Sequence, residues 1–154
     1  MVSILGGAIL NPPVVFSESR MQAPDFRETD LAGNVHTLQN YSGKMLVLYF
    51  WASWCPYCRQ DVSSMIQVYQ KYQPRGVQFL SISLDDNESK LRDFVTKKRI
   101  PYPVAFRGKG WGHPLAKLYG LEGIPTYVLI DEEGKIIDTD VGSEALIAVL
   151  SQTA

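Results

Sequence analysis

The alternation of apolar and polar blocks along the chain predicts an α/β domain. The continuous apolar run at 45–50 is typical of a short strand that is covered on both faces, and the largely apolar segment 77–84 predicts a second strand. Between them, apolar residues at positions 62, 65, 66 and 69 recur at helical spacing, which predicts a helix over 56–72. Because a strand, a helix and a second strand follow one another, the two strands are expected to run parallel in one sheet.

Shorter elements are predicted for the rest of the chain from turn residues, helix caps and apolar spacing. In chain order they are a hairpin over 26–38 that turns at Gly33-Asn34, a helix capped by Asn87 that runs to about Lys98, an extended piece over 103–106, a helix near 114–119, strands at 126–130 and 135–140, and a last helix from Ser143.

Composition and length fit one globular domain. The 154 residues are 45% hydrophobic and 20% charged, which is enough apolar material for a substantial core. The formal net charge of -1 leaves no basic footprint for nucleic acid, so no nucleic-acid partner is expected.

The first residues differ from the rest of the chain. Residues 2–10 are almost wholly apolar and are followed by Asn11-Pro12-Pro13. This resembles the apolar region of an export signal, but no Lys or Arg precedes it, and so short a stretch cannot cross a bilayer as a helix. We therefore expect residues 1–21 to be the remnant of a signal or anchor, or a flexible arm, and residues 22–154 to form the folded domain.

The only two cysteines lie in Cys55-Pro56-Tyr57-Cys58, between the first strand and the first helix. Proline suits the first turn of a helix, so Pro56 is predicted at N1 and Cys55 at the N-cap. The free N–H groups of Tyr57 and Cys58, together with the helix dipole, would then favour a thiolate at Cys55. Cys55 is expected to be the nucleophile, and Cys58 to resolve a mixed disulfide formed there.

Other interpretations of the cysteine pair remain open at this point. A structural disulfide over so short a loop would restrict little chain entropy. A zinc site could in principle combine the pair with His36 and His113, but these histidines lie far apart in the sequence, and no metal site is predicted. A thiol metal chaperone, or a redox-insensitive binding module, is the non-enzymatic alternative.

The segment Trp51-Ala52-Ser53-Trp54-Cys55-Pro56-Tyr57-Cys58 resembles the active-site segment of thioredoxins. The wider chain is similar to the TlpA/ResA-like thiol-disulfide oxidoreductases of the thioredoxin superfamily. Residues 23–34 resemble an N-terminal hairpin that these proteins share with peroxiredoxins, residues 119–126 resemble their cis-proline loop, and residues 128–136 resemble their closing hairpin.

This resemblance implies a thioredoxin-like three-layer fold. The expected sheet is mixed and central, with helices on both faces, an N-terminal β-hairpin and a helix-strand insertion near 88–106. By the same resemblance Cys55 is the attacking thiol, Cys58 the resolving thiol, and Pro125 a cis-proline beside the disulfide. The implied substrate-binding residues are Trp54, Pro56, Tyr57, Ile124 and Pro125, and no cofactor beyond the redox-active disulfide is implied.

Two positions depart from the related patterns. Thioredoxin has a buried aspartate six residues before its first active cysteine, whereas this chain has Tyr49. TlpA-like proteins often carry a glutamate three residues after the second cysteine, where this chain has the shorter Asp61. Asp61 lies at i+3 from Cys58 on the predicted helix, so it is a candidate proton acceptor, while a solvated aspartate without a catalytic role remains the alternative.

The resemblance leads us to expect a monomeric enzyme that reduces protein disulfides outside the cytoplasmic membrane, either periplasmic or membrane-tethered. Cytochrome c maturation or similar protein assembly is the implied process, with a membrane thiol-disulfide carrier as reductant. The cysteine pair alone would also suit an oxidase or isomerase. A peroxidase is less favoured because Ala52 stands where peroxiredoxins have threonine, and a glutathione-dependent glutaredoxin shares only Pro56-Tyr57. Arg59 is expected on a solvated face.

Overall fold

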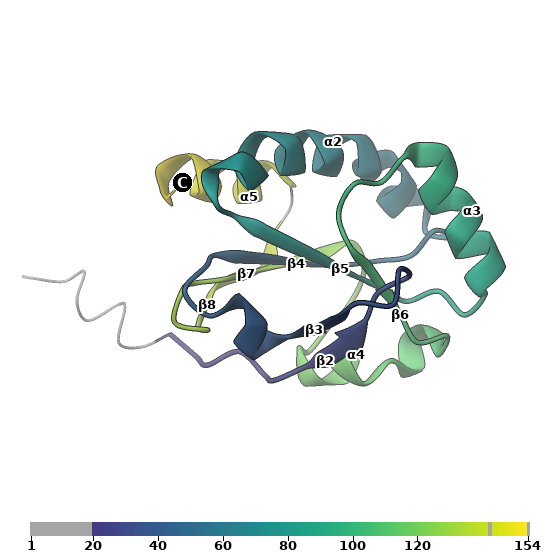
Figure 1. Ribbon diagram of the computed structural model, residues 1–154, viewed down its shortest axis with the longest axis horizontal. Helices are drawn as coiled ribbons and strands as arrows, with labels where there is room; N and C mark the ends of the chain where they lie inside the picture. The colour runs from purple at the N-terminus through teal and green to yellow at the C-terminus, as the bar shows by residue number, and fades with distance from the viewer. Residues whose placement is uncertain (1–19, 142, 154) are drawn as a thin grey trace, which may run out of the picture.

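A mixed sheet of five strands forms the centre of the molecule (Figure 1). The computed structural model describes residues 20–141 and 143–153. The strand order is β6-β5-β4-β7-β8. β5 and β6 run parallel to β4, as predicted for β4 and β5, whereas β7 is antiparallel to β4 and β8 is antiparallel to β7. The strands are β4 (Leu46–Trp51), β5 (Gln78–Ser83), β6 (Val104–Phe106), β7 (Thr126–Ile130) and β8 (Ile136–Val141).

Helices cover one face of this sheet, and a hairpin with a short helix covers the other (Figure 1). The layer above the sheet contains α2 (Pro56–Tyr72), α3 (Glu88–Lys98) and α5 (Ser143–Thr153). The layer below contains α4 (Pro114–Leu118) and the antiparallel pair β2 (Arg27–Thr29) and β3 (Val35–Thr37). The predicted three-layer α/β fold with an N-terminal hairpin is confirmed.

The pleat of β4 explains why both layers form. Its odd-numbered residues pack with α2, α3 and α5, and its even-numbered residues pack with the hairpin and α4. Every residue of this strand is buried. A strand that contacts apolar layers on both faces reads as a continuous apolar run, which is how the sequence identified β4.

The helices and strands begin and end close to the positions that the sequence predicted. Asn87 caps α3 by accepting a hydrogen bond from the Lys90 N–H at 3.0 Å. The hairpin turn is closed by Asp30, whose carboxylate accepts from the N–H groups of Ala32 and Asn34 at 2.9 Å. β4 and β8 each lie one residue later than predicted. Within the described residues, three short 3-10 helices have no counterpart in the predicted elements: η2 (Leu38–Tyr41), η3 (Gln73–Arg75) and η4 (Gly110–Gly112).

A buried charged cluster ties the hairpin to the loop before α4. Glu28 of β2 is 2% exposed, and its carboxylate accepts hydrogen bonds from Arg107 at 2.8 and 3.0 Å. His113 Nδ1 accepts from the Leu115 N–H, so the ring hydrogen sits on Nε2, which faces Glu28 at 3.2 Å. Burial raises the pKa of Glu28, but the bonds from His113 and Arg107 outweigh it, and the pKa is lowered overall.

The predicted N-terminal segment, residues 1–21, falls almost entirely outside the described residues. Over residues 20–141 and 143–153, no helix has both the length and the apolar character needed to cross a bilayer. The last helix begins at Ser143 as predicted; Leu146 and Leu150 are fully buried on it, and Val149 is partly buried.

Candidate functional site

Cys55 lies where β4 ends and α2 begins. It is the N-cap of α2, with extended backbone (φ -85°, ψ 119°), and Pro56 follows at the first helical position. The Cys55 Sγ accepts a hydrogen bond from the Cys58 N–H at 3.2 Å. The predicted cap is therefore confirmed, with the Cys58 N–H as the donor. A sulfur held in this way at a helix start is placed to carry negative charge.

The loop that carries Pro125 meets Cys55 from a distant part of the chain. The Ile124-Pro125 bond is cis, as the resemblance implied. The Cys55 thiol donates to the Ile124 carbonyl oxygen at 3.8 Å. The loop itself is braced by Thr126, whose hydroxyl donates to the Gly123 carbonyl at 2.7 Å. The structure thus brings Cys55, Ile124 and Pro125 together.

Exposed aromatic side chains flank the buried sulfurs. Both cysteines are free thiols, with exposed fractions of 4% for Cys55 and 0% for Cys58. Trp54 is 51% exposed and Tyr57 is 72% exposed, and Pro56 between them is also exposed. These three residues form an accessible, largely apolar rim beside the nucleophile candidate.

Cys58 lies one turn further into α2, beneath Cys55. Burial raises the pKa of the Cys58 thiol well above its ordinary value, and a hydrogen bond with Cys55 and the negative charges of Cys55 and Asp61 raise it further. Asp61 is half-buried on the same helix, and its charge also acts on Tyr49 and Tyr102. Cys58 is therefore a protonated thiol at neutral pH with a carboxylate close by.

Tyr49, at the position of thioredoxin's buried acid, lies in an aromatic stack below the cysteines. Its ring stacks on Tyr127 at 4.7 Å and on Trp51 at 6.1 Å, and Tyr102 meets it edge-on at 6.4 Å. Burial raises the pKa of Tyr49 far above its ordinary value. Tyr49 is thus a neutral phenol and no substitute for the missing carboxylate.

Asp85 and Arg59 both contact Ser53, two residues before Cys55, and neither was predicted to have a role in the site. Asp85 follows β5, is 2% exposed, and accepts hydrogen bonds from the Ser53 N–H and hydroxyl. Arg59 is exposed, as expected, but its guanidinium also donates to the Ser53 carbonyl at 2.9 Å, a contact that was not predicted. One feature of the sequence could have indicated the position of Asp85. It follows β5, which is parallel to β4, and the carboxyl ends of parallel strands lie at the same edge of a sheet.

A family model described as AhpC/TSA family matches residues 20–139, which is most of the chain. The chain belongs to the AhpC/TSA family. Within that family it is similar to the thiol-disulfide oxidoreductase ResA of Bacillus thuringiensis subsp. konkukian, at 33% identity over 123 residues, covering 80% of this chain and 69% of the relative. ResA of Geobacillus thermodenitrificans is 32% identical over 74% of this chain and 64% of its own length.

Solved structures agree with this membership. A putative thiol:disulfide interchange protein DsbE from Chlorobium tepidum superposes with a TM-score of 0.78 at 33% identity, covering 88% of this chain and 97% of that chain. A thiol-disulfide oxidoreductase from Bacteroides fragilis has a TM-score of 0.80 at 25% identity, covering 86% and 99%. The predicted ResA-like thiol-disulfide oxidoreductase with a thioredoxin-like fold is confirmed.

The two histidines of this AhpC/TSA family member lie in the lower layer, away from the cysteine pair, and each contacts a carboxylate there. His36 contacts Asp30 through Nε2 and Tyr41 through Nδ1, both at 2.7 Å, and His113 faces Glu28. Among the described residues, no group of three or more Cys, His, Asp or Glu side chains is arranged to hold a metal ion.

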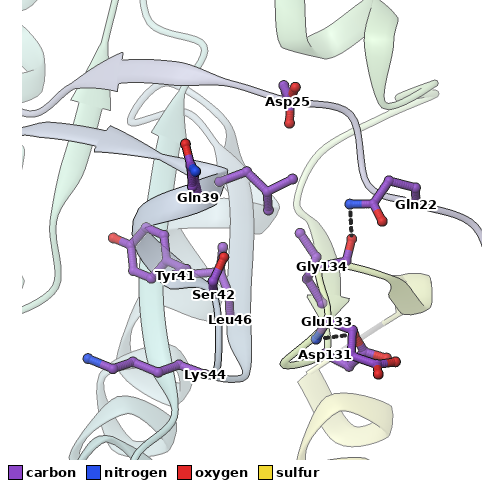
Figure 2. A pocket seen from close by; sticks show the side chains of 12 residues that line it. Gln22, Asp25, Gln39, Tyr41, Ser42, Lys44, Leu46, Asp131, Glu133 and Gly134 are labelled. Atoms are coloured by element: carbon purple, nitrogen blue, oxygen red, sulfur yellow. Dashed lines mark hydrogen bonds between the residues drawn. The ribbon is translucent and has the colours of Figure 1, made fainter.

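A separate pocket lies at the other end of the sheet (Figure 2). It is lined by residues between 22 and 46 and between 130 and 134, including Lys44 and Asp131, and the Gln22 amide donates to the Gly134 carbonyl at 2.9 Å across it. The pocket borders the start of β4, whereas the cysteines follow its end, and a strand of this length spans about 20 Å. The pocket is therefore not part of the thiol site.

Proposed function

We propose that this protein reduces disulfide bonds in other proteins by dithiol exchange through Cys55 and Cys58. One observation carries the proposal: the Cys55 sulfur accepts the Cys58 N–H at the start of α2 while it touches the Ile124 carbonyl. This combines a stabilised sulfur with a neighbouring backbone segment that can pair with an incoming peptide. The relatives named as thiol-disulfide oxidoreductases support the same reaction class.

In the first step, the Cys55 thiolate attacks one sulfur of the substrate disulfide. A bond forms between Cys55 and that sulfur, the substrate S–S bond breaks, and the second substrate sulfur leaves as a thiolate that takes up a proton. We assign Ile124 and Pro125 to the backbone side of the substrate groove. Trp54, Pro56 and Tyr57 supply its apolar rim, because their exposed side chains border Cys55.

In the second step, Cys58 attacks the Cys55 sulfur of the mixed disulfide. Because burial and neighbouring negative charge keep Cys58 protonated, the attack requires a base. We assign this role to Asp61, the nearby carboxylate on the same helix. The proton passes from Cys58 to Asp61, and the Cys55–Cys58 bond forms as the bond between Cys55 and the substrate sulfur breaks. That sulfur leaves as a thiolate and takes up a proton, so the substrate is released as a dithiol that has gained two electrons.

Regeneration requires a dithiol donor, because the Cys55–Cys58 disulfide must be reduced before the next cycle. We propose a membrane thiol-disulfide carrier as that donor, and action as a monomer outside the cytoplasmic membrane on proteins such as those of cytochrome c maturation. The membership in a family with ResA and DsbE relatives supports this setting.

Reduction of insulin by the dithiol form, with Cys55→Ser and Cys58→Ser as paired variants, tests the function. Cys55→Ser is expected to be inactive, whereas Cys58→Ser should accumulate a mixed disulfide with the substrate, because the attacking thiol remains and the resolving thiol is gone. A reduction potential near about -270 mV would support a reductase, and one near about -120 mV would contradict it.

The role of Asp61 has its own test. Asp61→Asn should slow resolution of a preformed mixed disulfide at neutral pH by about tenfold or more, because the proton acceptor is lost, while the first attack by Cys55 is unchanged. Stopped-flow measurement of the two steps separates them. Equal resolution rates in the parent protein and the variant would remove Asp61 from the mechanism.

A further inference from the structure

The short segment between β4 and Cys55 is fastened to β5 by a single carboxylate. The Ser53 N–H donates to Asp85 Oδ2 at 3.0 Å, and the Ser53 hydroxyl donates to Asp85 Oδ1 at 2.5 Å. Ser53 and Asp85 are 32 residues apart in the sequence, and their exposed fractions are 6% and 2%. Two hydrogen bonds from one residue to one buried carboxylate, one of them short, restrict the movement of Ser53.

Asp85 is itself held in one orientation. The Ser83 hydroxyl donates to Asp85 Oδ2 at 2.6 Å, and the Asp85 N–H donates back to the Ser83 hydroxyl oxygen at 3.0 Å. Burying a carboxylate is costly unless its oxygens receive hydrogen bonds. All the hydrogen bonds that its carboxylate receives from the described residues come from Ser53 and Ser83, so the buried carboxylate links the segment before Cys55 to the end of β5.

Arg59 fastens the same residue from the opposite side. Its guanidinium donates to the Ser53 carbonyl at 2.9 Å and lies over the ring of Phe94 in α3, 4.7 Å from the ring centre. Its backbone N–H donates to the Cys55 carbonyl at 3.0 Å. The N–H and hydroxyl of Ser53 are thus bound by Asp85, and its C=O is bound by Arg59.

We propose that Asp85 is a positioning residue for Cys55, acting through Ser53. The inference rests on the dithiol exchange proposed above and adds a residue to it. Cys55 is only two residues beyond Ser53, so a displacement of Ser53 passes directly to the cap of α2. The Cys55 sulfur meets the Cys58 N–H at 3.2 Å, so a displacement of the cap would change the length and direction of that bond.

Alkylation of Cys55 by iodoacetamide tests this proposal without any protein substrate. In a Cys58→Ser background, which retains the backbone N–H at position 58, the rate at neutral pH reports on the Cys55 thiolate alone. Asp85→Ala is expected to slow alkylation about tenfold, because Ser53 loses its acceptor. Asp85→Asn keeps an oxygen that can accept the Ser53 N–H, so it should recover part of the rate.

Glu28→Gln is the matched control, because it alters an equally buried carboxylate in the lower layer. It should lower stability but leave the alkylation rate unchanged. A rate for Asp85→Ala within about twofold of its background, in protein shown folded by circular dichroism, would overturn the proposal. An equal loss of rate in Glu28→Gln would also overturn it. If Asp85→Ala does not fold, Asp85→Asn decides, and an unchanged rate there overturns it.

Failure of insulin reduction would count against the proposed function and leave the alkylation result standing. Normal insulin reduction with alkylation rates unaffected by Asp85 would reject the positioning role alone. The two proposals therefore fail separately.

Discussion

At the scale of single residues, the site depends on two identical side chains in different environments. Cys55 is an N-cap whose sulfur accepts a backbone N–H, whereas Cys58 is fully buried and close to a carboxylate. Burial and neighbouring negative charge raise the pKa of Cys58, whereas the Cys55 sulfur has a backbone N–H donor at the start of a helix. This asymmetry supports a fixed order of attack in which Cys55 acts first and Cys58 resolves.

The hydroxyl of Tyr49 can be tested separately from the stacking of its ring. Its hydroxyl is buried and makes no hydrogen bond to any residue within the described part of the chain. Removing such a hydroxyl leaves the ring stacking intact, so Tyr49→Phe should keep or raise the free energy of unfolding, by up to about 1 kcal/mol. Urea unfolding of both proteins measures the change. A loss of more than about 1 kcal/mol would mean that the hydroxyl has a stabilising partner.

Glu28 makes the protein sensitive to acid. Its pKa is raised by burial but lowered more by His113 and Arg107, so the folded value lies below the ordinary 4.5. Its stabilisation is therefore present above pH 4.5 and is lost as pH falls through the lowered folded value. Glu28→Gln should cost about 1–3 kcal/mol at neutral pH and weaken the loss of stability in acid. Unfolding curves measured across acidic pH test both effects, and parallel pH profiles would contradict the assignment.

At the scale of elements, the sequence allowed prediction of those parts that depend on local signals. The start of α2 follows from Pro56 and the start of α3 from Asn87, because both are properties of a helix end. The Asp85 contact has no local signal; the predicted parallel pairing places Asp85 at the same edge as Ser53 but does not say that their side chains meet. An acidic pair after a strand normally lies in a solvated turn, and only the parallel pairing of β5 with β4 brings Asp85 to Ser53.

Arg99, at the end of α3, is the one non-glycine residue in the described part of the chain that has a positive φ. Arg99 caps α3 in the left-handed region, with φ 54° and ψ 50°, where a side chain is disfavoured. Arg99→Gly should therefore raise the free energy of unfolding by about 0.5–1 kcal/mol. Lys97→Gly, inside the same helix, is the control and should lower it by about 1 kcal/mol. Thermal unfolding compares them, and a loss of stability in both variants would contradict the argument.

At the scale of the whole molecule, one sheet separates two apolar layers: α2, α3 and α5 pack on one face, and the hairpin and α4 pack on the other. Met65 of α2 is fully buried in the upper layer, and Leu115 of α4 is 3% exposed in the lower one. Because β4, β5 and β7 contribute side chains to both layers, neither layer can lose its packing without exposing the strands that support the other. The domain should therefore unfold as one cooperative unit.

Truncating either layer tests this coupling. Met65→Ala and Leu115→Ala should each lower the free energy of unfolding by about 2–5 kcal/mol, because each leaves a cavity in a packed core. Both variants should still give a single urea transition, with circular dichroism and tryptophan fluorescence coinciding, since Trp51 is fully buried in the shared strand. If Leu115→Ala instead unfolded in two steps, with circular dichroism and tryptophan fluorescence no longer coinciding, the lower layer would be an independent unit. The hairpin and α4 would then be dispensable for holding Cys55 at the end of β4.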